Sequence, residues 1–123
     1  MSAEHYKQVV ADYIRLMSVG DWQGVAGLYA EDATVEDPVG AEPHRGIEAV
    51  AAFYKGAVSN GVKLHLDGPV RVAGREVAFP FHAEVKFDGN TMHIHVIDVF
   101  KFNDAGKIVA MRAFFGQDNF VPA

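Results

Sequence analysis

The repeat of apolar side chains changes near the middle of this chain, from the three- and four-residue steps of a helix to the two-residue alternation of a strand. In the first half, one apolar stripe predicts a helix of about four turns. The stripe consists of Tyr6, Val9, Val10, Tyr13, Leu16 and Met17. Gly20 ends this helix, and Asp21 is placed to cap a second, short one. A third helix is expected at about 47–59.

The second half of the chain predicts strands. A short alternating strand follows Gly61. Three longer strands are expected, separated by Gly-containing turns, at 77–87, 92–102 and 108–115. Helices followed by an antiparallel meander indicate the α+β class, with three N-terminal helices packed on a curved, mainly antiparallel sheet that forms a cone with an apolar interior.

Composition limits the size and the partners of the protein. With 123 residues, half of them hydrophobic, the chain is predicted to fold as a single domain spanning 1–123. Its 16 acidic and 11 basic residues give a net charge of −5 without clustered Lys and Arg, so we expect no nucleic-acid partner. Neither a signal peptide nor a membrane span is visible in the sequence, which predicts a cytoplasmic protein with no membrane partner and a small neutral or apolar ligand.

Asp98 lies in an apolar row of a predicted strand. Alternation over 92–102 puts it on the same face as Val96 and Phe100 and sends His95 to the other face. An ionised, unpaired carboxylate in such a row is unfavourable, so Asp98 must either find a cation or keep its proton with a raised pKa. A protonated Asp98 would donate a hydrogen bond into a dry pocket. The alternative is a structural role, with a bond to a backbone N–H or to Arg112 on the next strand.

Asp37 is a second acid that could point into the apolar interior, although its sequence pattern is less clear than that of Asp98. Alternation in this short extended segment turns either Glu36 or Asp37 toward the interior. The alternative is a solvated acid that caps a turn before Pro38.

Three tyrosines fall on faces that look inward. Tyr13 lies on the apolar stripe of the first helix, and Tyr29 and Tyr54 occupy similar positions in the segments that follow. A buried phenol needs a hydrogen-bond partner, and a chain of phenols strengthens its terminal donor. Ordinary core packing explains most buried tyrosines equally well.

The sequence lacks the motifs of several other functional sites, including metal sites, phosphate-binding loops and serine hydrolase sites. His93 and His95 share a strand face with His82 nearby, but this is the face away from the apolar row, and no inward carboxylate completes a metal site. The histidines therefore predict a solvated surface or a dimer contact, and no metal. No cysteine, glycine-rich phosphate loop or Gly-x-Ser-x-Gly elbow occurs.

Taken together, Tyr13, Asp37-Pro38 and Ile97-Asp98-Val99 give the chain a resemblance to the Δ5-3-ketosteroid isomerases, a family of the cone-shaped NTF2-like superfamily. The resemblance runs nearly from end to end. It is carried by the segments Ala11-Asp12-Tyr13-Ile14, Val19-Gly20-Asp21, Tyr29 to Pro38, Ala52-Phe53-Tyr54, Gly68-Pro69-Val70-Arg71 and Val96-Ile97-Asp98-Val99. It implies a steroid delta-isomerase that converts Δ5-3-ketosteroids to conjugated Δ4-3-ketosteroids through a dienolate.

The resemblance also implies roles for single residues. Asp37 would be the general base, Tyr13 and a protonated Asp98 would form the oxyanion hole, and Tyr54 and Tyr29 would support Tyr13 through hydrogen bonds. It implies a homodimer that binds a steroid and needs no cofactor. Apolar walls for the steroid rings would come from Val39, Phe53, Val62, Phe79, Phe81, Met111, Phe114 and Phe115.

Two other functions stay open at this point. A cyclase or epoxide hydrolase with the same cone fold would use the pocket carboxylates to move protons on a different substrate. A non-catalytic binder of apolar ligands would have Asp37 on its surface and Asp98 as a structural residue. The cone fold by itself does not decide, because one fold serves many functions.

Overall fold

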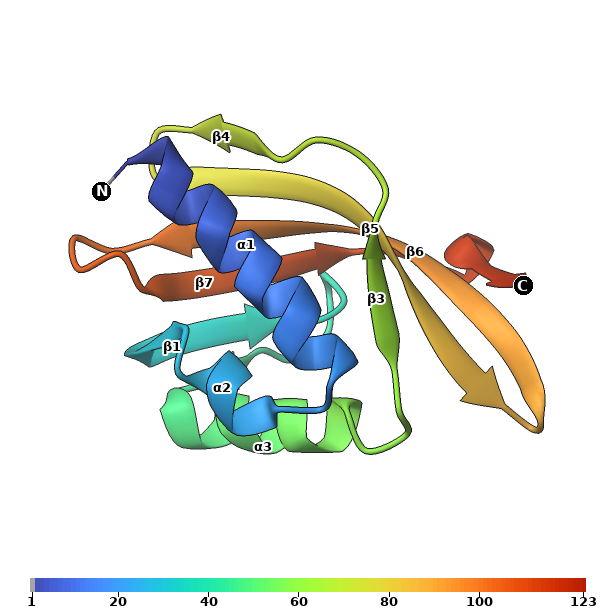
Figure 1. Ribbon diagram of the computed structural model, residues 1–123. Coiled ribbons are helices and arrows are strands. Elements are labelled where there is room, and N and C mark those ends of the chain that lie inside the picture. Colours follow the sequence, from blue (N-terminus) through green and yellow to red (C-terminus); the bar gives the residue numbers. More distant parts are fainter. Residues whose placement is uncertain (1) are drawn as a thin grey trace.

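The computed structural model describes residues 2–123 and combines three α-helices with one eight-stranded sheet (Figure 1). The helices are α1 (Ala3–Ser18), α2 (Trp22–Ala26) and α3 (Ile47–Ala57). The strands are β1 (Tyr29–Glu36), β2 (His44–Arg45), β3 (Lys63–Leu66), β4 (Arg71–Ala73), β5 (Glu76–Phe87), β6 (Asn90–Phe102), β7 (Ile108–Phe114) and β8 (Phe120–Pro122), with a 3-10 turn, η1 (Gln117–Asn119), before β8.

Local sequence signals set the limits of the first two helices. The Ser2 side chain accepts a hydrogen bond from the His5 backbone N–H at the start of α1. Gly20, which has a φ of 77°, lets the chain turn away after α1. The Asp21 side chain then accepts from the Gly24 N–H and starts α2, as the sequence predicted.

The sheet is open and mixed. Its main path runs β2-β1-β7-β6-β5-β3, with β4 added to β5 and β8 added to β6. Every pairing is antiparallel except that of β1 with β7, which is parallel. The α+β class, the three helices and the mainly antiparallel sheet are thereby confirmed. The parallel pair and the short strands β2, β4 and β8 were not predicted, because short or non-local pairings leave little trace in a periodic pattern.

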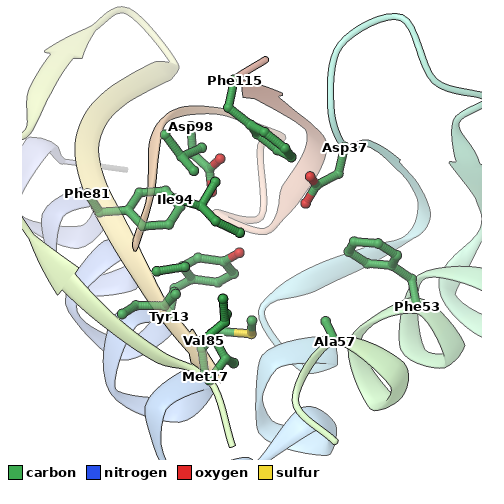
Figure 2. Close-up of a pocket in the computed structure, with 14 residues that line it drawn as sticks. Tyr13, Met17, Asp37, Phe53, Ala57, Phe81, Val85, Ile94, Asp98 and Phe115 are labelled. Atoms are coloured by element: carbon green, nitrogen blue, oxygen red, sulfur yellow. The ribbon is translucent and has the colours of Figure 1, made fainter. Parts of the chain in front are cut away.

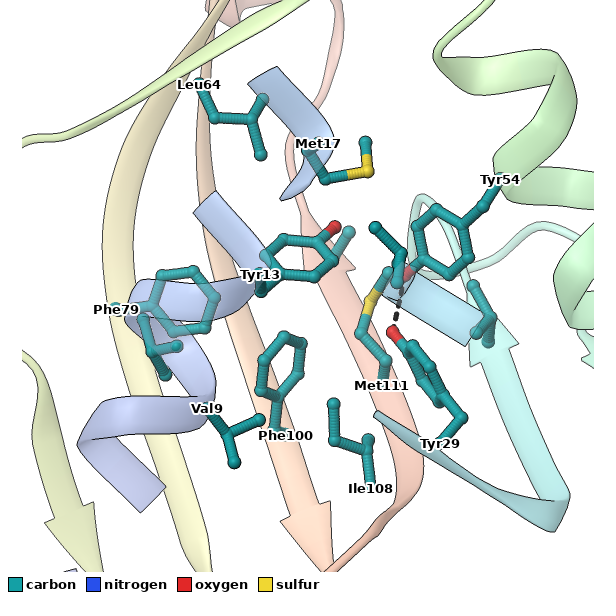
Figure 3. Packing of buried hydrophobic residues seen from close by; sticks show 14 of the residues in the cluster. Val9, Tyr13, Met17, Tyr29, Tyr54, Leu64, Phe79, Phe100, Ile108 and Met111 are labelled. Atoms are coloured by element: carbon teal, nitrogen blue, oxygen red, sulfur yellow. Dashed lines mark hydrogen bonds between the residues drawn. The ribbon is translucent and has the colours of Figure 1, made fainter. Parts of the chain in front are cut away.

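The core lies between the helices and the concave face of the sheet, which curves around α1 (Figures 1 and 3). Alternation along β6 buries Val96, Asp98, Phe100 and Phe102. The intervening Ile97 is 49% exposed on the outer face.

The end of β5 is open to solvent. Alternation puts Phe87 on the same face as the buried Phe79 and Phe81, but Phe87 is 68% exposed. The hairpin of β5 and β6 extends beyond the helices at this end (Figure 1), so no helix of residues 2–123 covers its inner face there. Asp88 and Gly89 form the tight turn, with φ values of 51° and 78°.

Candidate active site

A cavity with a volume of about 220 Å³ opens between the helices and the concave face of the sheet (Figure 2). Among the described residues that line it, the ionisable side chains are those of Tyr13, Asp37 and Asp98. The other lining residues are apolar: Met17, Phe53, Ala57, Val62, Leu64, Phe81, Ala83, Val85, Ile94, Val96 and Phe115. Such a cavity suits an apolar molecule with polar atoms at one place.

Asp98 reaches the cavity from the middle of β6, where it lies opposite Phe79 of β5 and Ala113 of β7. Its side chain is 1% exposed. Within residues 2–123 neither carboxyl oxygen has a hydrogen-bond partner. The pKa of Asp98 is raised well above its ordinary value, mainly by desolvation and to a smaller extent by the charge of Asp37. The raised pKa favours the protonated form of Asp98, whose O–H can donate a hydrogen bond into the cavity.

Asp37 reaches the same cavity from the segment that follows β1. It is only half-buried, and the peptide bond that joins it to Pro38 is cis. Burial raises the pKa of Asp37 to about 6. At pH 7 this group is mostly ionised, yet its pKa is close enough to neutrality for it to take up and return a proton.

Tyr13 lies on α1 and points its hydroxyl toward the cavity (Figure 2). Its ring is 3% exposed and packs edge to face against Phe100 and Phe79, with ring centroids 5.1 and 6.2 Å away. The pKa of Tyr13 is raised well above its ordinary value, mainly by desolvation and to a smaller extent by the charge of Asp98. The phenol therefore keeps its proton and is a donor with a fixed position.

Two further tyrosines, Tyr29 and Tyr54, lie beside Tyr13 (Figure 3). The hydroxyl groups of Tyr29 and Tyr54 form a short hydrogen bond, and both side chains are buried. The Tyr54 ring contacts the Tyr13 ring edge to face, with centroids 6.0 Å apart. The structure thus contains the Tyr29–Tyr54 hydrogen bond of the predicted chain and places the Tyr13 ring against Tyr54.

Four of the eight residues expected in the apolar walls line the cavity, namely Phe53, Val62, Phe81 and Phe115. The other four lie elsewhere. Phe79 and Met111 are 0% and 1% exposed and belong to the core below the cavity. Phe114 follows Ala113 in β7, so alternation turns it outward, where it is 42% exposed. Val39 is outside the lining, and its backbone N–H donates to the Ala113 carbonyl at 2.8 Å.

The sequence also left lining residues unidentified as such. Met17, Ala57 and Leu64 lie on apolar faces of their elements, but a periodic pattern does not separate cavity residues from core residues. The β5 and β6 residues Ala83, Val85, Ile94 and Val96 share an inward face through alternation, and that signal could have indicated them. Their place in the cavity depends on how far the helices cover the sheet.

Four histidines, His65, His82, His93 and His95, lie on the opposite, convex face of the sheet. His82 Nδ1 is 2.8 Å from an Asp67 carboxyl oxygen, and His65 Nε2 is 3.1 Å from Glu84 Oε1. Rings of His82 and His93 are in contact, with centroids 4.6 Å apart. Within residues 2–123 no group of three or more His, Asp or Glu side chains is arranged to hold a metal ion.

The helices cover a curved, open sheet, and one apolar cavity between them holds a phenol and two acids with raised pKa values. These features define a protein of the NTF2-like class with a candidate site for a small molecule. The sequence matches the family model described as the SnoaL-like domain over residues 10–111. The chain belongs to this family, and its fold is the NTF2-like fold that the sequence predicted.

Three relatives show what other members do. Over 121 residues, which is 98% of this chain and 97% of the relative, the sequence is 38% identical to a steroid delta-isomerase of Nocardioides simplex. Over 115 residues, 89% of this chain and 41% of the relative, it is 30% identical to the epoxide hydrolase LasB of Streptomyces lasalocidi. Among solved structures it is similar to the epoxide hydrolase/cyclase-like enzyme SalBIII, described for its role in pyran ring formation in the polyether salinomycin, with a TM-score of 0.91, 29% identity and full coverage of both chains.

The relatives are therefore enzymes of two kinds, isomerases and epoxide hydrolases or cyclases. No helix within residues 2–123 is both long and apolar enough to cross a membrane.

Proposed function

We propose that this protein is a steroid delta-isomerase, which converts Δ5-3-ketosteroids to conjugated Δ4-3-ketosteroids without a cofactor. The observation that carries the proposal is the pair of acids in one apolar cavity. Asp98 is 1% exposed with both oxygens unpartnered, whereas Asp37 is half-buried with a pKa of about 6. The 38% identity to a steroid delta-isomerase over nearly the whole chain supports the same reaction.

In the proposed mechanism the ionised Asp37 removes a proton from the carbon between the carbonyl group and the double bond. The C–H electron pair moves into the π system, and a dienolate forms with its negative charge on the carbonyl oxygen. Asp37 then returns the proton to the far carbon of the diene, which leaves the conjugated enone. A positioned base contributes about 10²–10⁴-fold to such a rate.

The dienolate oxygen would accept hydrogen bonds from Tyr13 and from protonated Asp98. Both donors are buried and neutral, so they need little reorganisation when charge develops on that oxygen. Removal of one such donor typically lowers kcat about 10²–10³-fold. Tyr54 and Tyr29, joined by their hydrogen bond, would limit the movement of the Tyr13 ring that packs on them.

The conjugated enone absorbs in the ultraviolet where the unconjugated ketone does not, and this property gives a direct test. Purified protein is mixed with a Δ5-3-ketosteroid, and the Asp37→Asn variant is assayed in parallel. We expect turnover in the wild type and its loss in the variant, with a steroid-like phenol still bound by both. Binding without turnover in the wild type would contradict the proposal and favour a carrier of apolar ligands.

A second candidate is an epoxide hydrolase or cyclase, favoured by the full-length similarity to SalBIII at a TM-score of 0.91. Protonated Asp98 would donate its proton to the epoxide oxygen while Asp37 accepts the proton of the attacking hydroxyl or water. Ring opening of an epoxide by wild-type protein that leaves a Δ5-3-ketosteroid unchanged would favour this function over isomerisation.

The resemblance to ketosteroid isomerases adds two further proposals, a homodimer and a cytoplasmic location. Light scattering coupled to gel filtration measures the first. A mass of one chain, 13.4 kDa, would contradict it, and twice that mass would support it.

A further inference from the structure

Glu36 is the last residue of β1 and stands directly before Asp37, but its carboxylate is outside the cavity lining. Its two oxygens have different partners. Oε2 accepts a hydrogen bond from the Gly40 backbone N–H at 2.9 Å, and Oε1 accepts one from Arg112 Nε at 3.0 Å. The side chain therefore connects β1, the segment after it and β7.

The bond to Gly40 closes the turn that contains Asp37. Residues 37–39 lie between the Glu36 backbone and the amide that the Glu36 side chain holds. A charge-assisted bond of this kind is stronger than one between neutral groups. Gly40 has a φ of 101°, a conformation that residues with a Cβ rarely adopt, so the turn has its shape only with glycine at this position.

The bond to Arg112 fixes the same turn to β7. Glu36 and Arg112 are partners in the parallel pairing of β1 with β7. One residue further along β7, the Ala113 carbonyl accepts the Val39 N–H at 2.8 Å, and Ala113 lies opposite Asp98 in the pairing of β7 with β6. The turn that holds Asp37 is thus attached on both sides to the strand beside Asp98.

We propose that Glu36 is a positioning residue that holds the Asp37 carboxylate at its depth in the cavity, facing Asp98. The inference rests on the proposed function of Asp37 as a base. Glu36 does not touch the substrate in this account, and it acts only through the turn at 37–40. The ionisable groups that face Asp37 across the cavity, Tyr13 and Asp98, are left unchanged by any substitution of Glu36.

The test compares Glu36→Ala, Glu36→Gln and Arg112→Met. The alanine variant loses both contacts, the glutamine variant keeps one amide oxygen that can accept from the Gly40 N–H, and Arg112→Met keeps the Gly40 bond. Asp32→Ala is the matched control, because it removes an exposed acid from the same strand. Circular dichroism and urea unfolding verify that each variant folds.

We expect Glu36→Ala to lower kcat about 10- to 100-fold, since a small displacement of a catalytic group has effects of that size. KM should change little. The pKa of Asp37, measured by NMR of its ¹³C-labelled carboxyl group, should fall from about 6 toward its ordinary value as water gains access. Glu36→Gln and Arg112→Met should retain more activity than Glu36→Ala, and Asp32→Ala should equal the wild type.

A folded Glu36→Ala variant with wild-type kcat and an unchanged Asp37 pKa would overturn the proposal. Equal losses in Asp32→Ala would overturn it too, because they would point to a general effect of charge. The NMR measurement needs no turnover. If the wild type fails to isomerise a ketosteroid, the proposed function fails, while the Asp37 pKa still decides whether Glu36 positions this carboxylate.

Discussion

Asp37, in the turn after β1, and Asp98, in β6, face one cavity, and burial raises the pKa of both carboxyl groups (Figure 2). Asp98 comes from the middle of β6, where neighbours on both sides keep water away. Asp37 comes from a turn after β1 that is partly open to solvent. The difference in burial favours the protonated form of Asp98, which can donate a hydrogen bond, and the ionised form of Asp37, which can accept a proton.

The pH dependence of activity should follow Asp37. A base must be ionised to act, so kcat/KM should fall by about tenfold per pH unit below the Asp37 pKa of about 6 and level off above it. Initial rates of enone formation between pH 4.5 and 8 measure the profile. A constant rate down to pH 4.5 would mean that Asp37 is not the base.

Asp98 should make folding stability decrease as the pH rises. In the unfolded chain its pKa is close to the ordinary 3.8, whereas in the folded protein the pKa is raised well above that value. Between the two pKa values the folded state holds a proton that the unfolded state has lost, so the free energy of unfolding falls with increasing pH. The slope from one such group is about 1.4 kcal/mol per pH unit.

The Asp98→Asn variant removes this slope and keeps a side chain of similar size. Urea unfolding of wild type and variant at several values from pH 5 to 8 should show a stability difference that grows in favour of the variant with increasing pH. The contribution of Asp37 is common to both proteins and cancels in the difference. Parallel stability curves would show that Asp98 is not protonated in the folded state.

Substitutions of Asp98 should also show whether its hydrogen-bond donation matters or only the volume of its side chain. Asp98→Asn can still donate a hydrogen bond to the dienolate oxygen through its amide N–H, whereas Asp98→Leu cannot. We expect the leucine variant to lose about 10²–10³-fold in kcat and the asparagine variant clearly less. The enone absorbance assay measures both. Equal losses in the two variants would remove the donor role from the mechanism.

The bond between Tyr29 and Tyr54 should be visible as coupling in a double-mutant cycle. Either single change to Phe leaves a buried hydroxyl without its partner, at a cost of about 1–3 kcal/mol in the free energy of unfolding. The double variant removes both hydroxyls, so it should be less destabilised than the sum of the single variants. Urea unfolding of the four proteins gives the coupling energy. Additive losses would show that the bond contributes nothing to stability.

The elements with regular periods could be predicted from the sequence. The stripe on α1 and the alternation along β6 depend on geometry that repeats over a few residues, so they are readable without knowledge of the rest of the fold. For the same reason the inward position of Asp98 follows from its neighbours Val96 and Phe100. Phe114, which the resemblance placed in the apolar walls, lies outside the cavity lining, because alternation along β7 turns it outward beside the buried Ala113.

The depth of a side chain below the cavity could not be predicted. Phe79 and Phe81 share one face of β5, yet Phe81 lines the cavity and Phe79 is covered by Tyr13 and Phe100. The difference arises because α1 crosses the sheet above Phe79, a contact between segments far apart in the chain. A periodic pattern shows which face of a strand points inward, but it does not show how far along that strand a helix covers the face.

The sequence by itself determined the helices, the long strands, the row that contains Asp98 and the resemblance that points to Asp37 and Tyr13. Only the tertiary structure decided that β1 pairs in parallel with β7, which attaches the turn of Asp37 to the strand beside Asp98. Secondary structure follows from hydrogen bonds and side-chain alternation between near neighbours. The meeting of two acids in one cavity follows from packing between segments that are distant in sequence, and the protonation state of each acid then depends on how much water that packing excludes.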